Sequence, residues 1–182
     1  MMDGADDNQL IELAKNGDRE AFNEVVCRHR VGVINVIYRM CGDPSLAEDA
    51  AQVAFIQVWK HLPGFTPRTT FKSWLYRIAI NAALDGLRRN KPTVAIDDLP
   101  LASREEKVEI ALEQRERMRM VRKAVHALPE ACRAVIILRE YEEQSYQEIA
   151  TTLEIPIGTV MSRLAYARKL LAQRLNPVLE EA

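Results

Sequence analysis

The amino-acid sequence predicts an all-α protein made of two small helical domains, and three observations support this fold class. Aromatic residues make up only 6% of the 182 residues, whereas the helix-favouring residues Ala, Leu, Arg and Glu are plentiful. Apolar residues recur every three or four positions over long stretches. Residues 91–108 interrupt this pattern with prolines and acids, so we expect a flexible linker there, between domains at residues 1–90 and 109–182.

The composition argues against several classes of protein. No apolar run approaches the ~20 residues that a membrane-spanning helix needs, and the first ten residues are acidic and polar, unlike a signal peptide. The three cysteines are odd in number and widely spaced, so they predict no disulfide framework and favour a reducing cytoplasm. We therefore expect a cytoplasmic protein without membrane insertion.

Capping signals and breaks divide the first domain into four helices. Residues 8–40 predict two of them, and Asp18 follows the break and caps the second. Ser45 and Glu48 form a Ser-x-x-Glu pattern, which predicts a capping box for a third helix that ends before Pro63. A short basic loop then leads to a fourth helix with one apolar face.

The second domain contains a helix-turn-helix pattern. It begins with a helix over residues 109–128, and Pro129 opens the next helix. Ser145 and Glu148 form another Ser-x-x-Glu pattern, which predicts a capped helix, a short turn and a further helix over residues 157–171. This is the arrangement that places a recognition helix in the major groove of DNA.

The last helix has the residue types of a DNA-reading surface. Residues 155–179 contain four basic residues and no acid, which favours a phosphate-bearing partner. Its outer, early part would reach base edges with Thr159, Met161, Ser162, Arg163 and Tyr166. Basic residues further along would meet phosphates, namely Arg168, Lys169 and Arg174. The alternative is an ordinary helical hairpin with a solvated basic face.

A second basic stretch, residues 66–91, contains six basic residues and one acid. Aromatic side chains alternate with these cations, and such a pattern can hold unstacked bases by stacking and by attraction to the backbone. Phe71 and Trp74 also fall at core spacing, so packing inside the domain is a strong alternative for both. Tyr76 and Arg77 are the better candidates for exposed contacts.

One face of the third predicted helix combines polar and apolar residues. Asp49, Gln52 and Ile56 share this face at helical spacing. A polar pair beside an apolar residue suits a protein interface, and the alternative is a solvated helix face.

Catalytic and metal-binding chemistry has little support in the sequence. Cys27-x-His29 has the residue types of a metal site, but no second pair lies at zinc-site spacing. There is no phosphate-binding glycine loop and no nucleophile motif, so we expect no enzyme activity, no cofactor and no small-molecule substrate. His61 and His126 lie near predicted helix C-termini, where the helix dipole favours an imidazolium, and capping accounts for both.

Three stretches resemble the sigma-70 family of bacterial RNA polymerase sigma factors, specifically its compact extracytoplasmic-function (ECF) group. Residues 46–65, LAEDAAQVAFIQVWKHLPGF, are similar to the polymerase-binding part of sigma region 2. Residues 71–89, FKSWLYRIAINAALDGLRR, are similar to its promoter-melting and −10-recognition part, and residues 128–171 are similar to region 4. The resemblance implies a non-enzymatic factor that binds core polymerase and directs initiation at specific promoters.

The resemblance also implies a role for each group of residues. Docking on the clamp helices of the polymerase β′ subunit would use Asp49, Gln52 and Ile56. Capture and melting of the −10 element would use Arg68, Thr70, Lys72, Tyr76, Arg77, Asn81, Arg88 and Arg89. Reading of the −35 element would use Thr159, Met161, Ser162, Arg163, Tyr166, Arg168 and Lys169. The second domain would also contact the polymerase β flap, and an anti-sigma factor would hold the protein inactive.

Two positions depart from the family pattern. Val53 stands where the clamp-binding motif commonly has an acid, and Met161 stands where the recognition helix often has a basic residue. These departures support one alternative, an interaction protein that keeps the sigma fold and has lost promoter activity. A second alternative is a freestanding helix-turn-helix regulator that binds duplex DNA without polymerase. A third, a cysteine-based redox or metal sensor, is compatible with sigma function.

Overall fold

The computed structural model describes residues 6–66, 70–89 and 108–179, with side chains described from residue 114 to residue 176 in the last range. Within these ranges the secondary structure is helical and contains no strand, which confirms the all-α prediction. Of the expected linker at residues 91–108, residues 91–107 lie outside the described residues, and Val108 begins α5.

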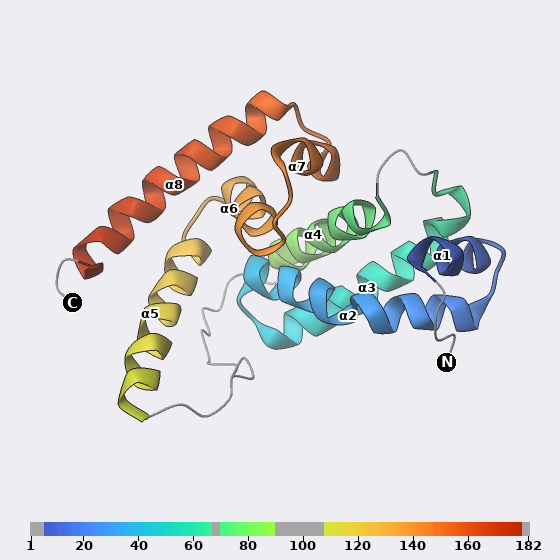
Figure 1. Ribbon diagram of the computed structural model, residues 1–182, viewed down its shortest axis with the longest axis horizontal. Helices are drawn as coiled ribbons and strands as arrows, with labels where there is room; N and C mark the ends of the chain where they lie inside the picture. The colour runs from blue at the N-terminus through green and yellow to red at the C-terminus, as the bar shows by residue number, and fades with distance from the viewer. Residues whose placement is uncertain (1–5, 67–69, 90–107, 180–182) are drawn as a thin grey trace.

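The helices form two groups that lie against each other (Figure 1). The first group contains α1 (Asp7–Lys15), α2 (Arg19–Cys41), α3 (Pro44–His61), the 3₁₀ turn η1 (Leu62–Gly64) and α4 (Phe71–Arg89). The second group contains α5 (Val108–His126), α6 (Glu130–Ile136), the π-helical turn η2 (Ile137–Tyr141), α7 (Tyr146–Leu153) and α8 (Ile157–Leu179).

Local capping explains where two of the helices begin. The Asp18 carboxylate accepts hydrogen bonds from the first free backbone N–H groups of α2, at 2.9 and 3.0 Å. Ser145 and Glu148 form the expected reciprocal capping box at the start of α7. Both predicted caps are confirmed. Each cap accepts hydrogen bonds from backbone N–H groups that have no partner inside the helix.

The capping box expected at Ser45 and Glu48 is wrong. Helix α3 starts at Pro44, and Asp43 is its cap, accepting from the Leu46 N–H at 2.9 Å. Proline suits the first helical position because its fixed φ is already helical and its missing N–H would have had no partner there. Pro44 therefore places the helix start before Ser45.

Apolar faces hold each group together. In the first group α2, α3 and α4 pack side by side, and the largest fully buried side chains are Leu10, Ile37, Met40, Leu62, Leu75 and Ile80. In the second group the corresponding residues are Leu128, Ile136, Ile137, Leu138, Ile149 and Leu164. Burial of a side chain of this size contributes about 1.5–3 kcal/mol to stability.

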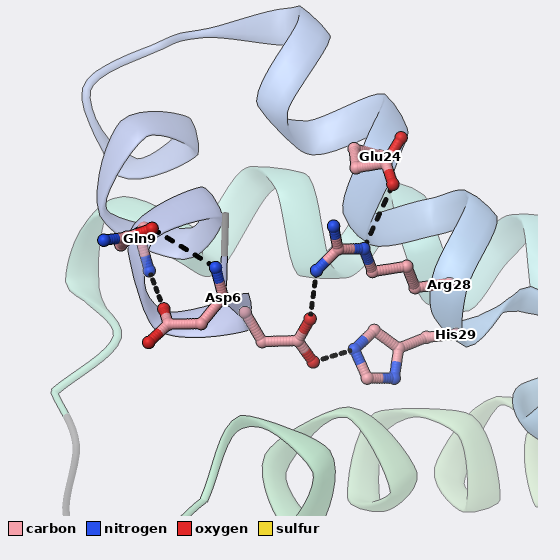
Figure 2. A network of polar contacts seen from close by, with 6 residues as sticks. Asp6, Gln9, Glu24, Arg28 and His29 are labelled. Carbon is pink, nitrogen blue, oxygen red and sulfur yellow. Dashed lines mark hydrogen bonds and ion pairs between the residues drawn. The ribbon is translucent and has the colours of Figure 1, made fainter. Parts of the chain in front are cut away.

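Polar contacts fasten α1 to α2 (Figure 2). The Asp7 carboxylate accepts from the Arg28 guanidinium at 3.1 Å and lies 2.7 Å from Nε2 of His29. Nε of Arg28 also donates to Glu24 at 3.0 Å, one turn earlier on α2. The guanidinium therefore joins an acid on each helix at the surface of the first group.

A buried arginine joins the two groups. The Arg133 guanidinium of α6 donates to the Met40 carbonyl at the end of α2. It also donates to the carbonyls of His126 and Leu128, at 2.5 and 3.0 Å. One side chain thus binds the carboxyl ends of α2 and α5, where helices carry unpaired carbonyls and partial negative charge.

His126 packs closely against the same junction. Gly42 has a left-handed φ of 75°, and a Cβ at this position would overlap the His126 imidazole. Burial, followed by the charge of Arg133, lowers the pKa of His126 to about 4. The prediction of an imidazolium favoured by the helix dipole is therefore wrong for His126, because desolvation and a neighbouring cation outweigh the dipole.

Replacing Arg133 should separate the two groups and destabilise the protein. We expect Arg133→Met to lower the free energy of unfolding by about 2–4 kcal/mol, because buried carbonyls lose their donors. Urea unfolding followed by circular dichroism measures this change. The matched control is Arg117→Met at an exposed position of α5, which should stay within about 0.5 kcal/mol of the parent. Equal losses in both variants would contradict the role given to Arg133.

His126 should make stability depend on pH. Its folded pKa of about 4 lies below the ordinary 6.5, so the unfolded chain binds the proton more readily. The contribution is complete above pH 6.5 and is lost as the pH falls toward 4. From pH 7 to pH 5 we expect a loss of about 1 kcal/mol that is absent in His126→Gln. Urea unfolding at both pH values measures it, and an equal loss in both proteins would show that another group is responsible.

Candidate nucleic-acid and polymerase interfaces

Helix α3 presents the first candidate interface. The inward face of α3 consists of small residues, which let the helix pack closely on its neighbours. These buried residues are Ala47, Ala50, Ala51 and Ala54. The opposite face turns outward, and the structure brings Asp49, Gln52 and Ile56 together there as exposed side chains. Ile56 is 53% exposed and Val53 is 41% exposed.

A shallow hollow adjoins this face. Its walls come from α2 and α3. Apolar Val26, Ile34 and Phe55 and charged Arg30 and Glu48 line it, together with Gln52 and Ile56. Exposed apolar surface with a charged rim is typical of protein interfaces.

The start of α4 is organised by packing and capping. The Thr70 hydroxyl accepts from the Ser73 N–H at 3.2 Å, so it has a local role at the helix start. Phe71 is buried, and Trp74 is half-buried and stacks on Phe65 with ring centroids 4.7 Å apart. Phe71 and Trp74 thus both help to pack the first group, while Arg68 lies outside the described residues.

Tyr76 is not exposed, contrary to the sequence-based expectation. Its side chain is 3% exposed, and its O–H donates to the Glu142 carboxylate of the second group at 2.6 Å. Gly32 makes room for it, because a Cβ there would lie 3.0 Å from the Tyr76 oxygen. Burial, followed by the bond to Glu142, raises the pKa of Tyr76. Tyr76 is buried because it contacts the second group, and the local sequence of α4 does not predict this contact.

The remaining α4 residues that were assigned to DNA divide into two sets. Lys72 and Arg77 face the second group together with Tyr76. Lys72 Nζ lies 3.5 Å from Glu142, and Arg77 pairs with Glu154. A second set lies further along α4 and is exposed: Asn81, Arg88 and Arg89.

Helices α7 and α8 form the helix-turn-helix. The turn between them places Glu154 in the left-handed region, at φ 53°, and the Ile155 N–H donates to the Ala150 carbonyl at 3.0 Å. The inner face of α8 buries Val160, Leu164 and Ala167. Its outer face exposes Met161 by 54% and Tyr166 by 52%, and Ser162 and Lys169 are exposed as well. Thr159 and Arg163 are half-buried on the same helix.

Arg168 already has partners within the protein. Its guanidinium donates to Glu140 at 2.9 Å and to the Tyr146 hydroxyl at 3.5 Å. The bond to Glu140, followed by the bond to Tyr146, raises the pKa of Arg168. Both partners are exposed or half-exposed, so a phosphate would compete with a weak surface pair.

The acids that face these cations were not among the residues predicted from the sequence. Glu140, Glu142 and Glu154 each pair with a residue assigned to DNA. For Glu140 and Glu142 the sequence does contain a signal, because acids cluster at residues 140–143, directly before the helix-turn-helix. Its pairing with α4 could not be read locally, because Glu142 and Tyr76 are 66 residues apart in the chain.

The described residues contain no candidate metal site and no candidate membrane-spanning helix. Within residues 6–66, 70–89 and 108–179, no three His, Cys, Asp or Glu side chains gather in a way that could hold a metal ion. Cys27 is exposed, and His29 pairs with Asp7. Among the helices of these ranges, none is long and apolar enough to cross a membrane.

Comparisons with known proteins agree with this geometry. The Sigma-70 region 2 family matches residues 25–93, and the Sigma-70, region 4 family matches residues 118–171. The RNA polymerase sigma-H factor of Pseudomonas aeruginosa is 35% identical over 193 aligned residues, which cover all of both chains. The ECF RNA polymerase sigma factor SigW of Bacillus subtilis is 33% identical, over 91% of this chain and 95% of its own.

Solved structures share the fold. The structure of CnrH in complex with the cytosolic domain of CnrY has a TM-score of 0.71 and 25% identity, over 94% of this chain and 97% of that one. The sigma factor RpoE of Bartonella quintana, in complex with the anti-sigma factor NepR, has a TM-score of 0.66 and 21% identity, over 85% and 96%. From these matches along nearly its whole length, the chain belongs to the sigma-70 family of RNA polymerase sigma factors, in the extracytoplasmic-function group.

Proposed function

We propose that residues 1–90 bind core polymerase and the −10 element, and that residues 109–182 read the −35 element across a linker at residues 91–108. Members of this family are initiation factors rather than enzymes, and the polymerase carries out the chemistry. One observation carries the assignment: an exposed apolar and polar face on α3 and a separate exposed reading face on α8 belong to one chain. These two faces suit a protein partner and a DNA partner respectively.

The α3 face supports docking on the polymerase β′ clamp helices. Asp49 and Gln52 offer acceptors, and Ile56 offers apolar area that can be buried. Val53 removes one charge that relatives commonly have, so apolar contact would carry more of the affinity here. Docking also compensates for weak intrinsic DNA binding, since the net charge is −1 and two weak modules on one tether gain avidity.

The α4 surface supports capture of the melted −10 element. Lys72 and Arg77 suit the backbone, and exposed Asn81 can hydrogen-bond an unpaired base. Arg88 and Arg89, at the end of α4, would bind phosphates of the adjacent duplex. Trapping an exposed base couples recognition to melting, and no ATP is required.

The α8 surface supports readout of the −35 element. Tyr166 and Met161 can contact thymine methyl groups, and Arg163 can donate to guanine or phosphate. Methionine offers only apolar contact at position 161, so the −35 preference should be less dependent on guanine there. Contact with the β flap would come from the same group of helices.

We also propose control by an anti-sigma factor and action in the bacterial cytoplasm, where polymerase and promoter DNA are found. The Bartonella quintana protein with this fold is itself in complex with an anti-sigma factor. Such a partner would prevent initiation by covering the α3 face, the α4 surface or the α8 face.

Run-off transcription tests the proposed function. Purified core polymerase is supplied with pooled genomic promoter fragments, with and without the protein. We expect defined transcripts that require the protein, and their upstream sequences give both promoter elements. Duplex DNA binding without polymerase binding or transcripts would instead support a freestanding regulator. Polymerase binding without transcripts would support an interaction protein without promoter activity.

Removing the polar pair of α3 should weaken polymerase binding. We expect Asp49→Ala with Gln52→Ala to reduce affinity for core polymerase about tenfold, which corresponds to about 1.4 kcal/mol, with unfolding unchanged within about 0.5 kcal/mol. Fluorescence anisotropy of labelled protein measures the affinity. Asn8→Ala with Glu12→Ala removes one exposed amide and one exposed acid from α1 and should bind normally. Unchanged affinity in the α3 variant would refute the docking assignment.

Removing the exposed aromatic residue of α8 should weaken −35 recognition. We expect Tyr166→Ala to reduce transcription from a promoter with both elements about fivefold to tenfold, since a lost base contact costs about 1–3 kcal/mol. Stability should change little because the side chain is 52% exposed. Run-off yield on that promoter and on one with a scrambled −35 element measures the effect. Gln173→Ala, further along α8 and also exposed, is the control. An equal loss on both promoters would show that Tyr166 does not read the −35 element.

A further inference from the structure

The second group covers the face of α4 that carries Lys72, Tyr76 and Arg77. Tyr76 O–H donates to Glu142 at 2.6 Å, and Lys72 Nζ lies 3.5 Å from the same carboxylate. Arg77 pairs with Glu154. These three of the proposed −10 contacts are therefore paired with carboxylates of the chain itself.

The covered face also includes a hollow suited to an unstacked base. One wall comes from the first group, where the stacked rings of Phe65 and Trp74 lie beside Arg77. The other wall comes from the end of α7 and the following turn, through Thr152 and Glu154. Aromatic rings beside a guanidinium suit stacking and attraction to single-stranded nucleic acid. In this arrangement the hollow is closed on one side by the second group.

Closure buries Tyr76 and partly covers Arg77, whereas the Lys72 side chain stays 50% exposed. Tyr76 is 3% exposed, whereas Ile56 on α3 is 53% exposed. On α8, Met161 is 54% exposed and Tyr166 is 52% exposed. The closed chain can therefore still meet polymerase through α3, while Lys72, Tyr76 and Arg77 of its −10 surface are paired with carboxylates.

We propose that Glu142 and Glu154 occupy the phosphate-binding positions of α4 in the free chain, so that the second group and single-stranded −10 DNA compete for one face. The inference rests on the proposed function, because it takes α4 as the −10 surface. A carboxylate and a phosphate both present anionic oxygens to Lys, Arg and Tyr donors. The competition keeps the free factor from binding single strands until the two groups separate.

The two carboxylates contribute unequally. The Glu142 side chain is 11% exposed and meets two donors, so water and salt screen it little. The Glu154 side chain is 69% exposed, so its pair with Arg77 is screened and weaker. Glu154 also sits at the left-handed turn of the helix-turn-helix, which ties this contact to the position of α7.

The test measures single-strand affinity and the separation of the two groups in the full chain. The probe is a labelled single-stranded DNA of random sequence, about 12 nucleotides long, followed by fluorescence anisotropy. The variant is Glu142→Gln with Glu154→Gln, which keeps side-chain shape and removes both charges. The control is Glu116→Gln with Glu143→Gln, which changes the net charge equally at exposed positions. Small-angle X-ray scattering of each protein gives the radius of gyration.

We expect the variant to bind the probe about fivefold tighter than the parent and to have a larger radius of gyration. The control should match the parent in both measurements apart from a small general charge effect. Adding Lys72→Ala to the variant should abolish the gain, because the gain requires the uncovered face.

Two outcomes would overturn the proposal. Equal affinities for the variant and its control would show that the carboxylates do not compete with DNA. Expansion of the variant without tighter binding would show that the uncovered face does not bind single strands. Run-off transcription with the parent protein tests the proposed function separately. A failure of the competition between carboxylates and DNA can therefore be told apart from a failure of the proposed function.

Discussion

One buried cation, Arg133, lies at the junction of the two helical groups. The Arg133 guanidinium is surrounded by carbonyl oxygens from the ends of α2 and α5 rather than by a paired carboxylate. Burial lowers the pKa of Arg133, and the cost of burying the charge is offset by several charge-assisted hydrogen bonds at helix ends that carry partial negative charge. The neutral state of His126 and the requirement for glycine at position 42 both follow from this packing.

Two zones of different physical character hold the groups together. The zone at Arg133 is buried, so salt changes it little. The zone at α4 consists of ion pairs that are partly exposed, with the Arg77 side chain 29% exposed, so salt and competing anions act on it directly. This second zone coincides with the proposed −10 surface, so the contact most easily exchanged for phosphates is the one on the proposed DNA-binding face.

Much of the candidate site could be predicted from local sequence. The α3 face and the outer face of α8 follow from helical periodicity, because residues three or four apart share a face and their buried counterparts are apolar. The cap at Ser145 was also predictable, since its partner lies only three residues away. The start of α3 was missed because two local signals competed, and Pro44 with Asp43 prevailed over Ser45.

The sequence by itself determined the all-helical class, the helix-turn-helix and the family, because each depends on spacing within a few residues or on whole-length similarity. Tertiary structure alone decided that Tyr76 is buried, that His126 is neutral and that the cations of α4 face carboxylates. The partners that cause these states lie far away in the chain: Glu142 is 66 residues from Tyr76, Glu154 is 77 from Arg77, and Met40 is 93 from Arg133. Burial and charge act through space, so such pairings arise only when packing brings distant segments together.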